Sequence, residues 1–410
     1  MLGSSGNREG SSIRRRELLR GFAAASVYSL SRRVIARAPL KVVVVGGGIV
    51  GASIAMHLAQ AGAAVTVLDR IGPAKGATEK SFAWINTYVS DPHYRAMRLQ
   101  SLLAYRALDI PLELGITWGG YLNWTDSEAE AHDIRSYATS LAGTPYALRT
   151  LSAAELARIS PCLTPGPVAS AYFSAIDGHA DPVWVTYRFL DRAQLLGAKV
   201  VFPCEVTGLD FRRGRLAGMS TTRGRLVADR VVVAAGTNTP HLLSMAGFSL
   251  RLAHAPGILA HTLPIAEVTK MVYDGPRSVS FKQMANGRIV GTDAPAPPDL
   301  PAHREIRDHV VDFADDAVRA MHGTRVLEHI AAYLPAARAA TFDRLTLGFR
   351  PMPTDGFPVV GAIPGCPDVY VAVTHSGVTL APILGEYVSR EIFAEEQDSL
   401  APYRPSRFTG

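Results

Sequence analysis

The stretch "VVVVGGGIVGASIAMHLAQAGAAVTVLD", residues 42–69, joins a β-branched run, three spaced glycines and a terminal acidic residue. The nearly continuous apolar character of residues 40–45 predicts a buried parallel strand. Apolar residues at helical spacing then continue to about Gly62, and residues 65–68 predict a second strand. The order of strand, glycine-rich turn, helix and strand predicts a Rossmann-like βαβ unit, and therefore an α/β fold.

The glycines of this unit form a G-x-G-x-x-G pattern that is typical of dinucleotide binding. Gly46 allows a tight turn, Gly48 lets the backbone approach a pyrophosphate, and Gly51 lets the helix pack closely on the strand. The start of the helix, with Ile49 and Val50, offers backbone N–H groups and a positive dipole end to the phosphates. Asp69 follows the last glycine at the spacing expected of a residue that accepts hydrogen bonds from a ribose diol.

Two later segments also predict a buried strand that leads into a turn or a helix. Residues 228–243 predict another buried strand that runs into Ala234, Ala235 and Gly236, where the chain can pass close to a ligand. Residues 348–361, "GFRPMPTDGFPVVG", precede a strand at 368–373 and a helix at about 377–393. Three separated parts of the chain thus predict one cofactor-binding fold, as in a two-lobed flavoprotein.

These motifs together resemble the D-amino-acid oxidase and glycine oxidase family of FAD-dependent oxidoreductases. The resemblance spans about Lys41 to Phe393, with "GGGIVG" at 46–51, "AAGTNT" at 234–239, "RPMPTDGFPVVG" at 350–361 and "THSGVTLAP" at 374–382 as its anchors. "DGHADP" at 177–182 also resembles the middle segment of the family. The resemblance implies non-covalent FAD, because no residue clearly matches the His or Cys to which some relatives attach it.

The resemblance also implies a division into two lobes. A Rossmann-like FAD-binding domain is expected from residues 39–115, 176–247 and 341–395. A mixed-sheet α+β substrate domain is expected from 116–175 and 248–340, with a helix near 304–321. Residues 396–410 are expected to form a tail. The implied reaction is hydride transfer from the carbon beside an amine nitrogen to flavin N5, giving an imine that water hydrolyses.

Two residues are the candidates for direct substrate or flavin contact. Arg350 matches the Arg of the GLRP-type family motif, and a planar guanidinium can bind a carboxylate through two parallel hydrogen bonds. His375 falls just before the last helix, where relatives place a polar or charged residue. A structural Arg paired with an acidic neighbour and a hydrogen-bonded structural His remain the alternatives.

The remaining candidates would hold the cofactor. The helix that starts at Gly377 directs its positive end toward the N1–C2=O edge of the flavin, and the segment 76–86 is expected to wrap the pyrophosphate and flavin. Trp84 and Trp118 are interpreted as core residues. The predicted cofactor-binding residues are Gly46, Gly48, Ile49, Val50, Gly51, Asp69, Arg70, Thr78, Ser81, Val206, Ala235, Gly236, Gly377, Val378 and Thr379.

The charge distribution excludes nucleic acid as an expected partner. The formal net charge of the 410 residues is +6, from 42 basic and 36 acidic side chains. Residues 1–37 hold eight Arg and two Glu, so they account for all of this excess, and the rest of the chain is neutral. A neutral body has no basic groove. Three widely spaced cysteines give no zinc motif, and no metal site is predicted.

The N-terminal residues 1–38 leave two interpretations open. Arg15 and Arg16 precede a short apolar run from Gly21 to Leu30, which resembles a twin-arginine export signal and would place the protein in the periplasm. A disordered basic tail on a cytoplasmic protein is the alternative. No stretch reaches the ~18 apolar residues of a transmembrane helix.

Two functions from different classes therefore remain. The first is an FAD-dependent amine or amino-acid oxidoreductase, with oxygen or a quinone or carrier protein as electron acceptor. The second is a flavin-binding protein without turnover that serves as a subunit or scaffold. A nicotinamide-linked enzyme ranks third, because the chain holds one dinucleotide fingerprint.

Overall fold

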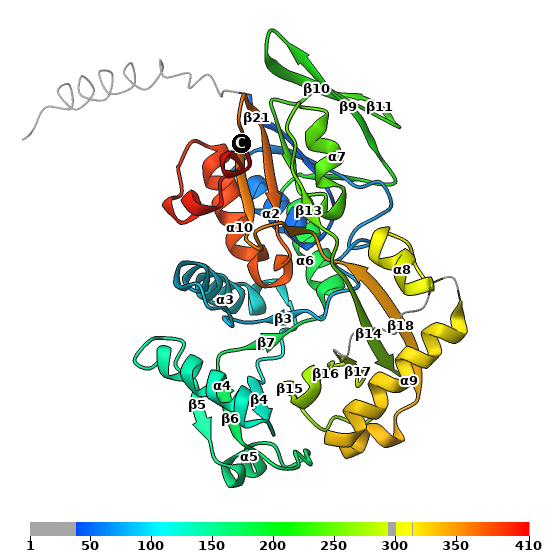
Figure 1. Cartoon of the computed structure of the whole chain (residues 1–410). Helices are drawn as coiled ribbons and strands as arrows, with labels where there is room; N and C mark the ends of the chain where they lie inside the picture. The colour runs from blue at the N-terminus through cyan, green and yellow to red at the C-terminus, as the bar shows by residue number, and fades with distance from the viewer. Residues whose placement is uncertain (1–37, 294–300, 314, 410) are drawn as a thin grey trace, which may run out of the picture. The chain divides into compact units, whose positions relative to one another are not determined.

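The computed structural model describes residues 38–293, 301–313 and 315–409, which lie within one compact unit from Leu40 onward apart from residues 38–39. The leader or tail expected at the N-terminus lies outside the described residues, except for its last position. Two large sheets organise the unit (Figure 1). None of the described helices has the length and apolar character that a membrane crossing requires.

The first sheet has six strands in the order β20-β21-β12-β1-β2-β8. The strands β1 (Lys41–Val45), β2 (Ala64–Leu68), β8 (Lys199–Val201), β12 (Arg230–Val233) and β21 (Cys366–Val373) are parallel to their neighbours, and β20 (Val359–Ile363) is antiparallel. Valines occupy both faces of β1 because the sheet is covered on both sides.

Helices cover one face of this sheet. The helix α2 (Ile49–Gln60) packs against α6 (Pro182–Leu195) and α10 (Gly377–Ile392), and α10 packs against α3 (Pro92–Leu112) (Figure 1). On the other face lie α7 (Thr239–Ser244) and a small sheet of β9 (Val206–Arg212), β10 (Arg215–Thr221) and β11 (Gly224–Leu226). This arrangement confirms the predicted α/β class with a Rossmann-like sheet.

The second sheet has eight strands in the order β18-β14-β17-β16-β15-β4-β6-β5. It draws β4 (Tyr121–Thr125), β5 (Arg149–Leu151) and β6 (Ser170–Ser174) from one part of the chain. The other strands, β14 (Pro256–Thr262), β15 (Val272–Gly275), β16 (Val279–Gln283), β17 (Ile289–Thr292) and β18 (Phe342–Phe349), come from a later part. Two short pairs, β3 (Trp84–Ile85) with β7 (Gly178–His179) and β13 (Leu252–Ala253) with β19 (Met352–Pro353), lie outside both large sheets.

Helices also pack on the second sheet. α4 (Glu128–Ser140) and α5 (Ala153–Ile159) flank its β4–β6 part, and α9 (Asp316–Tyr333) packs on β14 and β18. The single helix expected near 304–321 is two helices, α8 (Pro301–Asp308) and α9. The side chain of Asp315 accepts the Ala317 N–H, so it caps a new helix start within that range.

The structure also differs from two expected boundaries. Residues 342–349 were assigned to the FAD-binding domain, but they form β18, which pairs with β14 in the eight-stranded sheet. The segment after residue 395 is not a free tail. Leu400 and Tyr403 are buried, and Arg404 forms two hydrogen bonds of 2.7 and 2.6 Å with the Glu391 carboxylate on α10.

Lys282 on β16 is a charged side chain buried between the two sheets. It is 1% exposed, and its Nζ lies 3.4 Å from the carbonyl oxygens of Ala83 and Ala180. The ring of Phe82 lies 5.3 Å from the same atom. Burial lowers the pKa of Lys282 to about 7, and the Asp181 carboxylate opposes this shift.

This burial predicts a pH-dependent stability that Lys282→Met removes. Because the folded-state pKa of about 7 lies below the ordinary 10.5, the folded protein binds fewer protons between these values. The free energy of unfolding should therefore rise with pH in this window, by up to about 1.4 kcal/mol per unit. Urea unfolding at pH 7, 8 and 9 should show that the free energy of unfolding of wild type increases relative to that of Lys282→Met. The control is Lys199→Met, because Lys199 is exposed. A difference in free energy of unfolding between wild type and Lys282→Met that does not change with pH contradicts the prediction.

Candidate active site

A cavity of about 1230 Å³ extends from the glycine turn after β1 to the edge strands of the eight-stranded sheet. Its walls come from β1, α2, the segment after β12, β14, β18 and the start of α10. Small-molecule pockets usually enclose ~300–1,000 Å³. The cavity therefore has room for a dinucleotide together with a smaller molecule.

The glycine turn leaves the backbone bare at one end of this cavity. Gly46 has a φ of +114°, and a Cβ on it would lie 2.3 Å from the Ala234 carbonyl oxygen. A Cβ on Gly51 would lie 2.0 Å from the Gly46 carbonyl oxygen, so the first turn of α2 can sit on β1 only without a side chain there. Gly48 precedes α2 without a side-chain cap, and the first turn of α2 holds no acidic residue. The positive end of α2 thus faces the cavity.

Asp69 and Thr78 organise the same end of the cavity. The Asp69 carboxylate accepts the N–H of Gly47 at 2.8 Å and those of Ile71 and Gly72 at 2.9 Å. Thr78 Oγ1 accepts the Ile49 N–H at 3.2 Å, which leaves its own O–H as a donor. Both residues line the cavity, while the predicted contact between Asp69 and a ribose stays a prediction.

The other predicted cofactor residues also meet at this cavity. Ser81 accepts the Ala83 N–H through Oγ at 3.0 Å and so shapes the wall segment before β3. Thr379 Oγ1 donates to the Trp84 carbonyl oxygen at 2.9 Å, and the Val378 carbonyl accepts from Tyr105. The remaining predicted residues that line the cavity are Gly46, Gly48, Ile49, Val50, Arg70, Val206, Ala235, Gly236 and Gly377, whereas Gly51 lies beneath the turn.

A second helix start meets the first at the cavity. α10 begins at Gly377, where a Cβ would lie 3.1 Å from Val50 Cγ2 on α2. Its N-cap residue, Ser376, makes no side-chain cap, and its first turn has no acidic residue. Two positive helix ends without an acidic residue in their first turns therefore border one space, which suits an anionic cofactor and negative charge that forms on it.

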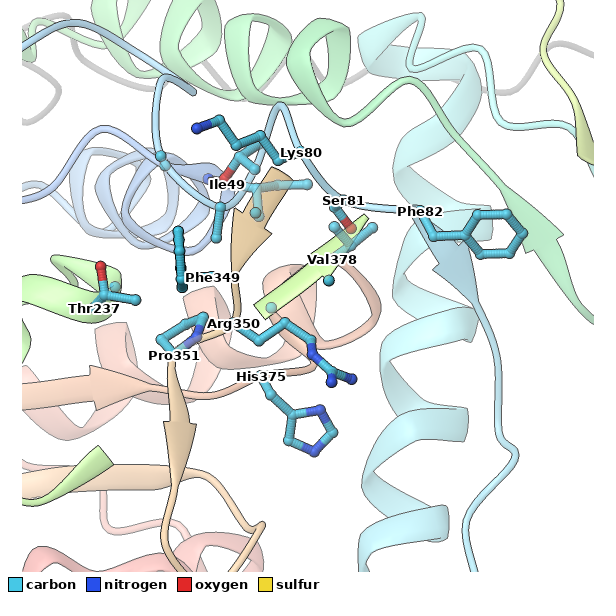
Figure 2. Close-up of a pocket in the computed structure, with 18 of the residues that line it drawn as sticks. Ile49, Lys80, Ser81, Phe82, Thr237, Phe349, Arg350, Pro351, His375 and Val378 are labelled. Atoms are coloured by element: carbon cyan, nitrogen blue, oxygen red, sulfur yellow. Dashed lines mark hydrogen bonds between the residues drawn. The ribbon is translucent and has the colours of Figure 1, made fainter. Parts of the chain in front are cut away.

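Arg350 and His375 lie together on the wall of the cavity (Figure 2). Arg350 follows β18, and its backbone N–H donates to the Ala255 carbonyl oxygen at 3.0 Å. Its guanidinium extends toward the imidazole of His375 in the close-up (Figure 2). Within the described residues, none of the ion pairs involves the Arg350 side chain. Among the described residues, Arg350 therefore has no acidic partner of the kind that the structural alternative requires.

His375 is neutral in this environment. Burial and, to a smaller extent, the positive charges of Arg98 and Arg350 lower its pKa to about 4, against a hydrogen bond with the Gly356 backbone. Its Nδ1 lies 3.3 Å from Ser376 Oγ. A neutral imidazole can both accept and donate a hydrogen bond.

Sequence analysis did not find several residues that line the same cavity. Trp84, which we expected in the core, lies on the wall, and its Nε1 donates to Asp177 at 2.9 Å. Asn86, Tyr88 and Arg98 lie there as well. Arg98 shows a signal that the sequence analysis overlooked, because it occupies the buried stripe of α3 beside Tyr94.

The residues present fit an adenine dinucleotide with an electron-accepting ring. The bare glycine backbone and the α2 start can hold a pyrophosphate, and the α10 start can face the ring. A search of the described ranges found no group of three or more His, Cys, Asp or Glu side chains placed to hold a metal ion.

Comparison with known proteins agrees with this fit. The model of the family described as "FAD dependent oxidoreductase" (DAO) matches residues 41–391. A Bacillus subtilis protein, "Uncharacterized oxidoreductase YurR", is 27% identical over 89% of this chain and 98% of its own length. The "D-amino acid dehydrogenase" of Rhizobium johnstonii is 25% identical over 78% of this chain and 88% of its own.

A solved structure has the same fold. The crystal structure of glycine oxidase from Geobacillus kaustophilus superimposes with a TM-score of 0.79. The sequence identity is 22%, and the match covers 90% of this chain and 100% of that one. It confirms the predicted fold class.

The glycine turn generates a prediction about cofactor retention. Gly51→Ala places a Cβ 2.0 Å from the Gly46 carbonyl oxygen, so α2 must move away from β1. Such overpacking costs about 1–3 kcal/mol, and we expect most of the bound FAD to be lost on purification. The measurement is the ratio of flavin absorbance to protein. Gly208→Ala, whose Cβ has its nearest neighbour at 3.9 Å, is the control. Full flavin content in Gly51→Ala contradicts the assignment.

Proposed function

Because the chain belongs to the DAO family of FAD-dependent oxidoreductases, we propose that it oxidises the C–N bond of an amino acid or a secondary amine. The observation that carries this proposal is the pair of Arg350 and neutral His375 on the wall of the cavity that also holds the glycine turn. FAD is the cofactor, and we propose that it is bound non-covalently.

Arg350 is the proposed binding group for a substrate carboxylate. Its guanidinium has five N–H donors in a fixed plane, which matches the two oxygens of a carboxylate. Since the side chain forms none of the ion pairs found among the described residues, it can accept such a ligand without breaking one. A substrate held there lies beside His375.

His375 is the proposed partner of the substrate nitrogen. With a pKa of about 4 the imidazole carries no charge near pH 7, so it does not repel an amine. Its free electron pair can accept an amine N–H and orient the adjacent C–H bond. When bound, the flavin supplies a two-electron acceptor at N5 for the hydride of that C–H bond, and water hydrolyses the resulting imine.

The relatives support an amino-acid substrate without fixing which one. Their names include a D-amino acid dehydrogenase and glycine oxidases. Those names also leave the acceptor open, because oxygen serves an oxidase while a quinone or carrier protein serves a dehydrogenase. The family match favours this enzyme over the alternative of a flavin-binding protein without turnover.

An anaerobic titration tests the proposal. The purified protein should show an oxidised-flavin spectrum that at least one compound bleaches. The panel consists of D-amino acids, glycine, N-methyl amino acids and cyclic imino acids. Peroxide formation in air then distinguishes oxygen from other acceptors. A spectrum that no member of the panel bleaches would favour the function without turnover.

Arg350→Ala tests the role of the guanidinium separately. Loss of a charge-assisted hydrogen-bonded pair costs about 1.5–3 kcal/mol, so we expect KM for a carboxylate substrate to rise about 10- to 100-fold. Flavin content should stay near that of wild type. Arg344→Ala is the matched control, because Arg344 lies on β18, the strand that Arg350 follows, and pairs with Asp343 at 2.6 Å. Parallel loss of flavin and affinity in Arg350→Ala would remove the substrate-binding role.

A further inference from the structure

Arg98 is a buried cation on the cavity wall whose hydrogen bonds all go to uncharged acceptors. It lies on α3, is 6% exposed, and its guanidinium lies 4.8 Å from the centre of the Tyr94 ring. Nη1 donates to Asn86 Oδ1 at 2.6 Å and to the Tyr88 carbonyl oxygen at 3.1 Å. Nη2 donates to Ser376 Oγ at 2.5 Å, so the side chain joins α3 to the start of α10.

The charge of Arg98 has no matching carboxylate. Among the residues that the structure describes, Arg98 forms no ion pair, and its buried Nε has no hydrogen-bond acceptor. The carboxyl group that its charge does influence is Asp177, which accepts hydrogen bonds from Trp84 and Ser174 instead. Burial raises the pKa of Asp177 to about 7, so this carboxyl does not carry a full negative charge at neutral pH. A buried cation without a charged partner is unfavourable unless an anion arrives from outside.

A second cation and a helix end reinforce this positive region. The positive charges of Arg98 and Arg350 both lower the pKa of His375, so both guanidinium groups act on the same imidazole. Ser376, which accepts from Arg98, is the N-cap of α10. Three acidic side chains of the lining have partners of their own: Asp69 accepts three backbone N–H groups, Asp274 accepts from Tyr121 and Ser280, and Asp293 pairs with Arg325 and His329. The wall around His375 therefore has an excess of positive charge.

We propose that the charge of Arg98 makes this wall selective for a carboxylate ligand without contacting the ligand. This proposal rests on the proposed function, in which an amino-acid carboxylate enters the cavity. Contact is not required, because three of the five Arg98 N–H groups already donate to Asn86, Tyr88 and Ser376, and its Nε is enclosed. Within a cavity of low dielectric, a full charge acts over several ångströms. Arg350 binds the carboxylate, and the charge of Arg98 makes the electrostatic potential at the carboxylate more positive.

The competing role is purely structural, with Arg98 acting only as a tie between α3, the 86–88 segment and α10. The two roles differ in what each substitution removes. Arg98→Lys keeps the charge and loses most of the hydrogen bonds, whereas Arg98→Gln keeps donors and loses the charge. Arg106→Gln is the matched control, because Arg106 lies on the same helix, over the Trp118 ring at 4.1 Å, and away from the cavity lining.

The test uses the FAD-loaded protein and two probes of the same shape. Anthranilate carries a carboxylate and 2-aminobenzamide a neutral amide, and the flavin absorbance reports the binding of each. We expect Arg98→Gln to weaken the binding of anthranilate about tenfold or more, while the affinity for 2-aminobenzamide changes less than about twofold. Arg98→Lys and Arg106→Gln should keep the wild-type preference for anthranilate over 2-aminobenzamide. A wild type without preference for anthranilate, or equal losses for both probes in Arg98→Gln, overturns the proposal.

A second readout follows the imidazole rather than the ligand. In Arg98→Gln the pKa of His375 should rise above its value of about 4 while burial and Arg350 still hold it below the ordinary 6.5, as followed by NMR titration of the ring, and in Arg98→Lys it should not rise. If Arg98→Gln does not fold, Ser376→Ala carries the test, because it cuts the tie and keeps the charge. Retained anthranilate preference in Ser376→Ala supports the role of the charge, and lost preference overturns it.

Failure of this inference is distinct from failure of the proposed function. Probe binding needs only the flavin spectrum and no turnover. A protein that prefers anthranilate but is bleached by no amine would refute the oxidoreductase proposal and retain the role of Arg98. If the protein turns over amino acids and Arg98→Gln keeps the preference for anthranilate, the proposed function stands and the proposed role of Arg98 is refuted.

Discussion

The contact between the Gly51 backbone and the Gly46 carbonyl oxygen determines the geometry of the cavity. With a Cβ position only 2.0 Å from that oxygen, α2 lies directly on β1. Because α2 in turn packs against α6 and α10, the whole helical layer is placed relative to the sheet by this contact. The start of α10 follows, since Gly377 lies against Val50. The positive ends of α2 and α10 both lie at the cavity because the Gly51 backbone packs closely against the Gly46 carbonyl group.

The electrostatics of the cavity divide it into two ends. At the glycine turn, Asp69 and the α2 start place a carboxylate and backbone N–H groups, which suit the sugar and phosphates of a nucleotide. At the other end, the positive charges of Arg350 and Arg98 act on a neutral His375. Arg350 follows β18 of the eight-stranded sheet, while α3 contributes Arg98. The proposed substrate end is thus assembled from both halves of the fold.

Local sequence patterns predicted the cofactor end well, because its determinants are local. The Gly46–Gly51 turn, the strands beside it and the start of α10 each follow from a short motif, and the fold class and FAD dependence are confirmed. The substrate end depends on contacts between distant segments. The pairing of β18 with β14 leaves little trace in the local sequence. The same holds for the hydrogen bond from Arg98 to Ser376, which are 278 residues apart in the chain. The helix break near Asp315 and the packing of residues 398–408 were missed because capping and burial there depend on partners elsewhere.

The C-terminal segment has a consequence for how the protein is handled. Arg407 donates to the Asp355 carboxylate at 2.7 Å and to the Phe357 carbonyl oxygen at 3.2 Å. Between those two residues lies Gly356, whose backbone hydrogen-bonds to His375. The final residues therefore brace the loop that orients the imidazole. An affinity tag or a deletion that disturbs Arg407 would therefore affect His375 through one short turn, although Arg407 itself does not line the cavity.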